Sequence, residues 1–426
     1  MIRILKYGEV PNREIFARTE PTINVESVVA EIIQTVRNQG DAALIDYTAR
    51  FDRCRLTTLQ VTPEEMDEAV ATVAPKFLEI LKKAAGNIRA FHEKQVRQSF
   101  VMTGSKGVVL GQKITPVDRA GLYVPGGTAA YPSTVLMDAI PACIAGCKEV
   151  VMVTPPSSEG KINPVILAAA KIAGVNRIFK VGGAQAIAAL AYGTESIPKV
   201  DKIVGPGNAF VAEAKQQVFG AVSIDMIAGP SEILIVADGK SSAKCVAADL
   251  LSQAEHDVLA SAVLVTDSME LAKEVQKELE VQIPLLERNE IARKSIDNNG
   301  KIIVADSLDA AIEISNEIAP EHLELCVDNP FDYLDAIRHA GSIFMGRNCP
   351  EALGDYFAGP NHTLPTSGTA KFSSPLSVDD FIKKTQYTYF TRDALREVAE
   401  DVAFFATKEG LTAHAKSAIV RLEEEK

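Results

Sequence analysis

The chain has no tryptophan, few histidines and no excess of positive charge. Its 426 residues include six histidines, and 44 Lys and Arg stand against 56 Asp and Glu, a net charge of −12. Proteins that bind nucleic acid or anionic membranes carry basic patches, so this balance argues against both partners. No apolar run is long enough to span a bilayer. Residues 1–15 lack a signal-peptide core because Glu9, Pro11 and Glu14 interrupt them. We therefore expect a cytoplasmic location.

Cysteine is also scarce. Six scattered cysteines do not form the dense framework of a small secreted protein. The composition, 47% hydrophobic and 23% charged, is typical of a soluble globular protein. A chain of this length is long for one core, so we expect two or three domains.

The first hundred residues show helical patterns. Apolar residues recur at helical spacing over residues 25–37. Thr62-Pro63-Glu64-Glu65 is a helix start, with Thr as the N-cap, Pro at the first position and Glu three residues after the cap. The stretch up to about Gln95 is predicted to be a long helix or a helix pair. Its His92 is expected on a solvated face, without a catalytic role.

From about Val108, short β-branched runs alternate with segments of helix length. This alternation predicts βαβ units and a parallel sheet. The predicted strands are residues 121–124, 150–154, 178–181, 202–204 and 233–236. Loops rich in Gly and Pro follow most of them, namely residues 125–127, 154–156, 182–185, 205–208 and 229–232. Open α/β sheets bind ligands at the carboxyl ends of their strands, so these loops predict a binding crevice.

A second α/β series follows. Its predicted strands are residues 262–266, 301–304 and 342–345, and its helices are residues 243–256, 269–279 and 308–318. The fold class is therefore α/β, with two similar Rossmann-like domains, a helical N-terminal segment and an extended, mostly helical C-terminal tail. We predict an arm over residues 1–24, a first domain from 25–112 with 235–377, a second over 113–234, and a tail over 378–426. The tail has too little apolar surface for its own core, so we expect it to pack elsewhere, for example on a second subunit.

Four of the histidines lie in small polar clusters. These clusters are Gln253 with His256, Glu321 with His322, Asp355 with His362, and Glu409 with His414. Such groups supply metal ligands and acid–base catalysts, so the chain reads as an enzyme, with a metal. Two His, one Asp and one Gln would suit Zn²⁺. Spacing alone leaves open whether they converge. Gln253 and His256 are three apart on a predicted helix and so project from one face, but taken alone this pair is more often a surface pair than a pair of metal ligands.

Glu321 and His322 are adjacent titratable residues that can divide acid–base work. Neighbours on a strand face opposite sides, so both can reach one substrate only at the end of an element, which Pro320 favours. The alternative is a surface Glu beside a core histidine. Residues 205–210 begin like a dinucleotide fingerprint but lack its last glycine, so spacing alone gives NAD little support.

Several long segments together resemble histidinol dehydrogenases. The resemblance runs from about Ile114 to His414, whereas the first hundred residues match only in general helical character. It rests on residues 121–127, 181–190, 205–211, 228–232, 250–256, 320–323, 354–356, 359–366 and 411–414.

This resemblance implies a homodimer that oxidises L-histidinol to L-histidine with two NAD⁺, through the aldehyde, as the last step of histidine biosynthesis. Glu321 and His322 would be the proton acceptors. One Zn²⁺ per subunit would bind Gln253, His256, Asp355 and His414, with His414 donated by the partner subunit. NAD would contact Tyr123, Gln185 and Asn208 on the domain formed by residues 113–234. L-Histidinol would contact Ser231, Gln253, His256, Glu321, His322, Asp355, His362, Glu409 and His414.

Two other classes remain open from the residues alone. In a zinc hydrolase, Glu321 would activate a metal-bound water and no nicotinamide would be needed. A non-catalytic, metal-dependent binding protein would hold the small molecule without turnover, although the Glu321–His322 pair would then have no purpose.

Overall fold

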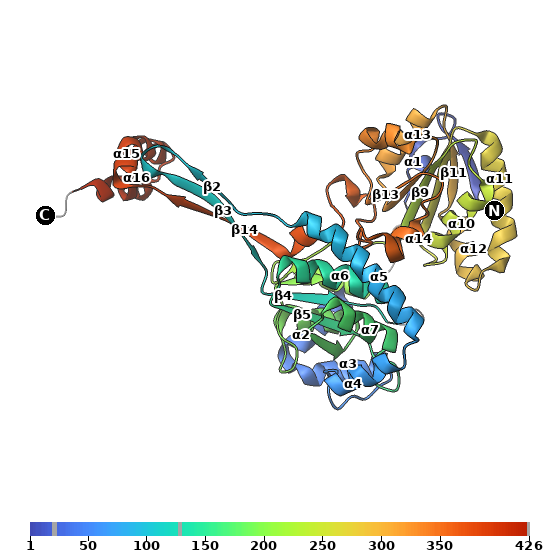
Figure 1. Ribbon diagram of the computed structural model, residues 1–426, viewed down its shortest axis with the longest axis horizontal. Helices are drawn as coiled ribbons and strands as arrows, with labels where there is room; N and C mark the ends of the chain where they lie inside the picture. The colour runs from blue at the N-terminus through green and yellow to red at the C-terminus, as the bar shows by residue number, and fades with distance from the viewer. Residues whose placement is uncertain (19–23, 127–129, 424–426) are drawn as a thin grey trace. The chain divides into compact units, whose positions relative to one another are not determined.

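The computed structural model describes residues 1–18, 24–126 and 130–423. The chain forms two compact units (Figure 1). Unit 1 consists of Met1–Gln95 and Val117–Phe381, and unit 2 consists of Val96–Pro116 and Ile382–Lys426. Unit 1 contains two parallel sheets, whereas unit 2 contains a small antiparallel sheet and two longer helices. The predicted α/β class is confirmed.

The first parallel sheet of unit 1 has five strands in the order β6-β5-β4-β7-β8. They are β4 (Arg119–Tyr123), β5 (Glu149–Thr154), β6 (Arg177–Lys180), β7 (Lys202–Val204) and β8 (Ser223–Ile224). The helices between them are α6 (Pro132–Ala145), α7 (Pro164–Ala173), α8 (Gly183–Tyr192) and α9 (Ala209–Val218). The strand order reverses between β4 and β7, which is where a doubly wound sheet opens a crevice for ligands.

The second parallel sheet has six strands in the order β1-β11-β10-β9-β12-β13. They are β1 (Arg3–Lys6), β9 (Glu232–Ala237), β10 (Ser261–Thr266), β11 (Lys301–Val304), β12 (His322–Cys326) and β13 (Ser342–Met345). Its helices are α10 (Ala243–Ala254), α11 (Met269–Gln282), α12 (Asn289–Asn298) and α13 (Leu308–Ile318). Strand β1 was not predicted, so the predicted N-terminal arm contributes an edge strand here.

The N-terminal helices cover the five-stranded sheet. Helices α2 (Glu26–Gln39) and α3 (Asp41–Phe51) share a core with α8 and α9, and α4 (Pro63–Ala71) and α5 (Pro75–His92) pack against α6 and α7. This packing differs from the predicted grouping of residues 25–112 with 235–377. An amphipathic helix shows that it covers an apolar surface but not which surface. The exact domain limits stay predictions.

Two local predictions in this region have different outcomes. Thr62 caps α4, since its Oγ1 accepts a hydrogen bond from the Glu65 N–H at 3.2 Å, and α4 and α5 form the predicted helix pair. His92, however, is buried rather than solvated. Its Nδ1 lies 2.8 Å from the Ile88 carbonyl oxygen and its Nε2 lies 3.3 Å from Nδ2 of Asn361. The charged residues beside His92 in the sequence indicated a solvated face, although His92 occupies a core position at the end of α5.

Unit 2 combines strands from two distant parts of the chain. Strands β2 (Phe100–Thr103), β3 (Val109–Pro116) and β14 (Ile382–Tyr389) pair antiparallel in the order β14-β3-β2. Helices α15 (Arg392–Lys408) and α16 (Thr412–Ile419) follow. The helices agree with the predicted tail, but β14 was not predicted.

The remaining elements are short. They are α1 (Asn12–Ile15), α14 (Glu351–Leu353), the π-helical turn η5 (Gly354–Ala358) and 3₁₀ turns at Glu93–Gln95, Ser105–Gly107, Ile283–Leu285, Pro330–Ala336, Thr369–Lys371, Val378–Phe381 and Val420–Leu422. Among the described residues, no helix has both the length and the apolar character that crossing a membrane requires.

Candidate active site

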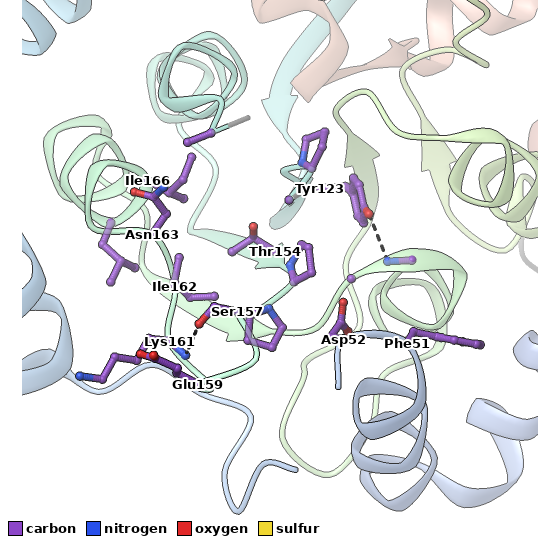
Figure 2. A pocket seen from close by; sticks show the side chains of 18 of the residues that line it. Phe51, Asp52, Tyr123, Thr154, Ser157, Glu159, Lys161, Ile162, Asn163 and Ile166 are labelled. Atoms are coloured by element: carbon purple, nitrogen blue, oxygen red, sulfur yellow. Dashed lines mark hydrogen bonds between the residues drawn. The ribbon is translucent and has the colours of Figure 1, made fainter. Parts of the chain in front are cut away.

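A large cavity of about 1140 Å³ lies at the carboxyl edge of the five-stranded sheet. The loops after β4, β5, β6 and β7 all contribute to its lining, which confirms the predicted crevice (Figure 2). Gly127, in the first of these loops, is outside the described residues. The three residues predicted to contact NAD, which are Tyr123, Gln185 and Asn208, all line this cavity.

Local structure fixes these three side chains. The Tyr123 hydroxyl accepts a hydrogen bond from the Gly183 N–H at 3.1 Å, and burial raises the pKa of Tyr123 to about 12. Gln185 is buried in the first turn of α8. Oδ1 of Asn208 caps α9 by accepting from the N–H groups of Phe210 and Val211 at 3.1 and 3.2 Å, so its Nδ2 is not used in the cap.

Gly205 explains how the loop after β7 reaches the cavity. Its φ of +113° is a conformation that only glycine adopts readily. A Cβ there would lie 2.1 Å from the Tyr123 carbonyl oxygen. Beneath the loop, the Gly205 N–H donates to Asp225 at 2.8 Å, and the buried Lys215 donates to the Gly205 carbonyl at 3.0 Å.

A second cavity of about 520 Å³ adjoins the first, and Pro125 and Asn208 line both. It lies where the carboxyl-end loops of the five-stranded sheet meet the amino ends of β9 and β12. Seven of the nine residues predicted to surround the substrate line it, namely Ser231, Gln253, His256, Glu321, His322, Asp355 and His362. The loop Gly229–Glu232, predicted to follow a strand of the sheet, precedes β9 instead.

The other two predicted residues, Glu409 and His414, belong to unit 2. Helix α15 ends at Lys408, and Gly410 has a φ of +79°, which confirms the predicted helix stop. His414 lies on α16, and both Glu409 and His414 are exposed. Their participation in the site stays a prediction.

Glu321 and His322 lie at the beginning of β12, where the backbone N–H and C=O of Glu232 contact both side chains. The Glu232 N–H donates to Oε2 of Glu321 at 2.8 Å, and Nδ1 of His322 lies 3.0 Å from the Glu232 carbonyl oxygen. A carbonyl only accepts, so Nδ1 must carry the hydrogen. In the neutral ring, Nε2 then has the free lone pair, and this buried atom has no hydrogen-bond partner among the described residues.

Carboxylates surround this histidine. Nε2 of His322 lies 3.5 Å from Oδ1 of Asp355 and 3.8 Å from Oε1 of Glu351. Burial lowers the pKa of His322, but Glu351, Glu321 and Asp355 outweigh it, so the pKa lies well above its usual value. Burial raises the pKa of Glu321 to about 8, against the opposing effect of His322.

Gln253 and His256 approach the cavity from the end of α10. The helix ends at Ala254, so Gln253 belongs to its last turn while His256 lies just beyond it. The prediction that both project from one face of one helix is therefore wrong for His256. A turn after the helix, in which the His256 N–H donates to the Gln253 carbonyl at 3.1 Å, places His256 in the lining of the same cavity. Burial lowers the pKa of His256, which favours a neutral imidazole with a lone pair for a ligand.

Asp355 occupies the π-helical turn Gly354–Ala358, a local irregularity that often marks functional sites. Burial raises its pKa, but His322, His362 and His256 more than offset this, so the pKa lies below its usual range. The Asp355 carbonyl oxygen lies 3.0 Å from Nδ1 of His362, and Nε2 of His362 lies 3.3 Å from Oγ1 of Thr134. Three histidines thus interact with one ionised carboxylate.

Sequence reasoning missed two residues of this site. Glu232 holds the Glu321–His322 pair through backbone atoms that every residue has, so its residue type does not indicate this role. Glu351 is buried at the beginning of α14, and one ligand atom each from Glu351, His322 and Asp355 lies within 4.8 Å of the others. No histidine lies near Glu351 in the sequence, so Glu351 belongs to none of the polar clusters that indicated the other site residues.

The residues lining the second cavity fit a zinc ion by their chemistry. An imidazole nitrogen, a carboxylate oxygen and an amide oxygen are all ligands that Zn²⁺ or similar ions accept. His256, Asp355 and Gln253 offer these atoms within unit 1. The unpartnered Nε2 of His322 beside Asp355 also indicates that something polar belongs in this space.

The fold and the two adjoining cavities define an α/β enzyme that acts on a small molecule. A family model described as histidinol dehydrogenase matches residues 17–422. The chain therefore belongs to the histidinol dehydrogenase family, and is an oxidoreductase of histidine biosynthesis.

Individual relatives agree with the family model. The chain is 57% identical over 401 residues to a histidinol dehydrogenase of Bacillus cereus, covering 94% of this chain and 93% of the relative. It is 53% identical over 430 positions to one of Clostridium acetobutylicum, covering 99% of both. The crystal structure of histidinol dehydrogenase from Elizabethkingia anophelis superimposes with a TM-score of 0.94 at 39% identity, covering 99% of this chain and 98% of that one. A hydrolase and a non-catalytic binding protein are thereby set aside.

Proposed function

We propose that the chain catalyses the NAD- and zinc-dependent, four-electron oxidation of L-histidinol to L-histidine through L-histidinaldehyde, the last step of histidine biosynthesis. One observation carries the proposal. A cavity that contains a buried acid–base pair shares part of its wall with a larger cavity built by strand-end loops. Two reactants held in these cavities would meet at Asn208 and Pro125, as hydride transfer requires.

The first oxidation needs a base at the substrate hydroxyl. Nδ1 of His322 is committed to the Glu232 carbonyl, so only Nε2 can take the proton, and this atom faces the cavity side with Asp355. General-base catalysis of this kind contributes about 10²–10⁴-fold. We assign His322 as the acceptor of the hydroxyl proton.

The second oxidation needs water added to the aldehyde. Glu321 lies beside His322, with 3.6 Å between Oε2 and Nδ1, and its pKa of about 8 suits proton exchange near neutral pH. We assign Glu321 as the base that activates this water. The backbone of one residue, Glu232, positions both bases, so both oxidations can use one substrate position.

The proposed cofactors have separate places. Gln253, His256 and Asp355, with His414 of a second copy, would hold one zinc ion per subunit, and Tyr123, Gln185 and Asn208 would contact NAD. When bound, Zn²⁺ would orient the imidazole and amine of histidinol and offset the carboxylates around His322, and NAD⁺ would accept the hydride. Ser231, His362 and Glu409 would complete the substrate's surroundings.

We further propose that the active enzyme is a homodimer with shared sites. Unit 1 supplies only three of the four proposed zinc ligands, and the fourth lies in unit 2. Unit 2 also exposes large apolar side chains on α15, including Phe404 at 67% and Phe405 at 68% exposure. Exposed apolar surface of this kind marks a protein interface.

Two measurements on the purified chain test the proposed function together. Metal analysis should find one zinc per subunit, and consumption of one histidinol should form two NADH, followed by absorbance. One NADH per histidinol, with aldehyde released, would contradict the four-electron reaction. Full turnover after complete removal of metal would contradict the role of zinc.

A further inference from the structure

A glutamine has two different ends, and only one of them can bind a metal ion. The amide oxygen has free lone pairs, whereas the NH₂ group only donates hydrogen bonds. Which end faces a site is decided by the hydrogen-bond partners of the other end. Gln253, whose side chain is 1% exposed, therefore needs a group that selects its orientation.

Glu351 meets this requirement. Gln253 forms hydrogen bonds to it only with Nε2 toward its carboxylate, at 2.5 Å to Oε1 and 3.2 Å to Oε2. In the opposite orientation, the amide oxygen would face carboxylate oxygens at these distances, which is repulsive. The side chain of Glu351 thus turns the NH₂ group toward itself and leaves the amide oxygen pointing away.

Other contacts hold Glu351 itself in place. Oγ of Ser252, the neighbour of Gln253 on α10, donates to Oε2 of Glu351 at 3.1 Å. The Glu351 N–H donates to Oε1 of Glu324, a buried side chain of β12, at 2.6 Å. Glu351 is itself 2% exposed. Glu351 also lies 3.8 Å from Nε2 of His322, and its contacts on the α10 side are those with Ser252 and Gln253.

We propose that Glu351 is a positioning residue, which orients the Gln253 amide so that its oxygen is the atom offered to the metal ion. This rests on the proposed zinc dependence and deepens it. Groups that orient metal ligands in this way typically change metal affinity or activity by about 10–100-fold when they are removed. Glu351 acts through Gln253 and is not assigned a contact with the substrate.

The principal test is Glu351→Met, which keeps the length of the side chain but removes both acceptors. Zinc affinity is measured by competition with a chromophoric chelator, on the full-length chain beside wild type. We expect the dissociation constant to rise by about 10–100-fold. The visible spectrum of the Co²⁺ form should also change, because the ligand set is disturbed, while NAD binding should remain.

Glu324→Gln is the matched control. It also alters a buried carboxyl group next to Glu351, but it keeps an oxygen for the Glu351 N–H and does not contact Gln253 in the described structure. Burial raises the pKa of Glu324 to about 9, with Asp249 adding to the effect, so a neutral side chain changes little there at neutral pH. Its zinc affinity should match wild type.

A reciprocal exchange keeps the proposal testable if Glu351→Met does not fold. In Gln253→Glu alone, two carboxylates face each other. In the double variant Gln253→Glu with Glu351→Gln, the amide again donates to the carboxylate, with the roles exchanged. The double variant should bind zinc more tightly than Gln253→Glu alone, which a merely structural role would not predict.

The outcomes separate cleanly. Wild-type zinc affinity in Glu351→Met, or no gain in the double variant, overturns the assignment. A shifted pH profile with unchanged zinc affinity overturns it too, because Glu351 would then act on His322. If wild type itself binds no zinc, the proposed function fails first, and the role of Glu351 fails with it.

Discussion

Nδ1 of His322 and the carbonyl oxygen of Glu232 lie 3.0 Å apart, and this contact determines which ring nitrogen is a base. The N–H of the same residue, Glu232, binds the Glu321 carboxylate at 2.8 Å. The strand pairing of β9 with β12 brings these groups together, so the acid–base pair is positioned by the sheet itself. Sites built on strands are held more rigidly than sites on loops.

Substitution of His322 by Gln should slow the first oxidation by about 10²–10⁴-fold, because Gln cannot accept the hydroxyl proton. Added histidinaldehyde should still be oxidised at a useful rate, since Glu321 and its contact with the Glu232 N–H remain. Stopped-flow measurement of NADH from each substrate separates the two half-reactions. An equal loss in both would contradict the proposed division of labour.

Glu321→Gln is the converse experiment. It should slow oxidation of the aldehyde more than oxidation of the alcohol, because an amide cannot activate water as a base. The same two assays measure it. A selective loss of the alcohol step instead would mean that the two roles are reversed.

Mixed dimers test the origin of the fourth ligand. Asp355→Ala and His414→Ala chains should each be inactive alone. In a symmetric dimer with shared sites, refolding them together gives hybrid dimers in which one site contains both intact residues. Random mixing should then restore roughly a quarter of wild-type activity. If both residues come from one chain, no hybrid regains activity.

Asp138 should make stability depend on pH. It is fully buried, and burial raises its pKa to about 8 from 3.8, with Asp225 adding to the effect. Between pH 3.8 and about pH 8, the Asp138 carboxyl group is ionised in the unfolded chain but protonated in the folded chain. Ionisation therefore favours unfolding, and this residue lowers stability by about 1.4 kcal/mol per pH unit as pH rises through this window.

Asp138→Asn removes the titration, so its free energy of unfolding relative to wild type should increase from pH 5 to pH 8. Urea denaturation at several pH values measures this difference. Asp46→Asn, on the exposed face of α3, should show no such trend. A parallel pH dependence in wild type and Asp138→Asn would show that the carboxyl group is ionised in the fold.

Gly205→Ala should weaken NAD binding. The new Cβ would lie 2.1 Å from the Tyr123 carbonyl oxygen, and the backbone conformation alone costs about 1–3 kcal/mol. The loop must shift, and Asn208 with it, so we expect a loss of affinity of roughly tenfold or more. Calorimetric titration measures it.

Gly86→Ala is the control, because it lies on an exposed face of α5 with open space around it. This change should leave NAD binding unchanged and stabilise the helix by about 0.5–1 kcal/mol. Equal NAD affinity in Gly205→Ala and wild type would show that the strand-end loop does not form the cofactor site.

The parallel sheets were largely predictable from sequence, for a physical reason. Strands buried on both faces are short apolar runs, so β7 and β11 coincide with their predicted ranges, and the half-buried edge strand β13 coincides with its range too. The antiparallel sheet of unit 2 was not predictable. All four residues of β2 are exposed, and nearly all of β14 is exposed too, so neither shows the alternation of a half-buried strand.

The candidate site divides in the same way. Polar clusters such as Glu321-His322 stand out in the sequence because titratable residues lie together. Gln253 and Asp355 are about a hundred residues apart, and only the family resemblance assigned them to one site. The fold places both in the lining of one cavity. Glu232 acts through its backbone N–H and C=O, and Glu351 acts through a contact between α10 and α14, so no pattern in the sequence could indicate either.

Among the residues that the structure describes, the two cavities have only Pro125 and Asn208 in common. Under the proposed reaction, the spent nicotinamide must leave and a fresh one arrive midway through each cycle. Two cavities that share so few lining residues permit that exchange while the aldehyde stays bound in the second cavity. Such a layout would protect the cell from a reactive carbonyl compound at the very moment when the enzyme changes its oxidant.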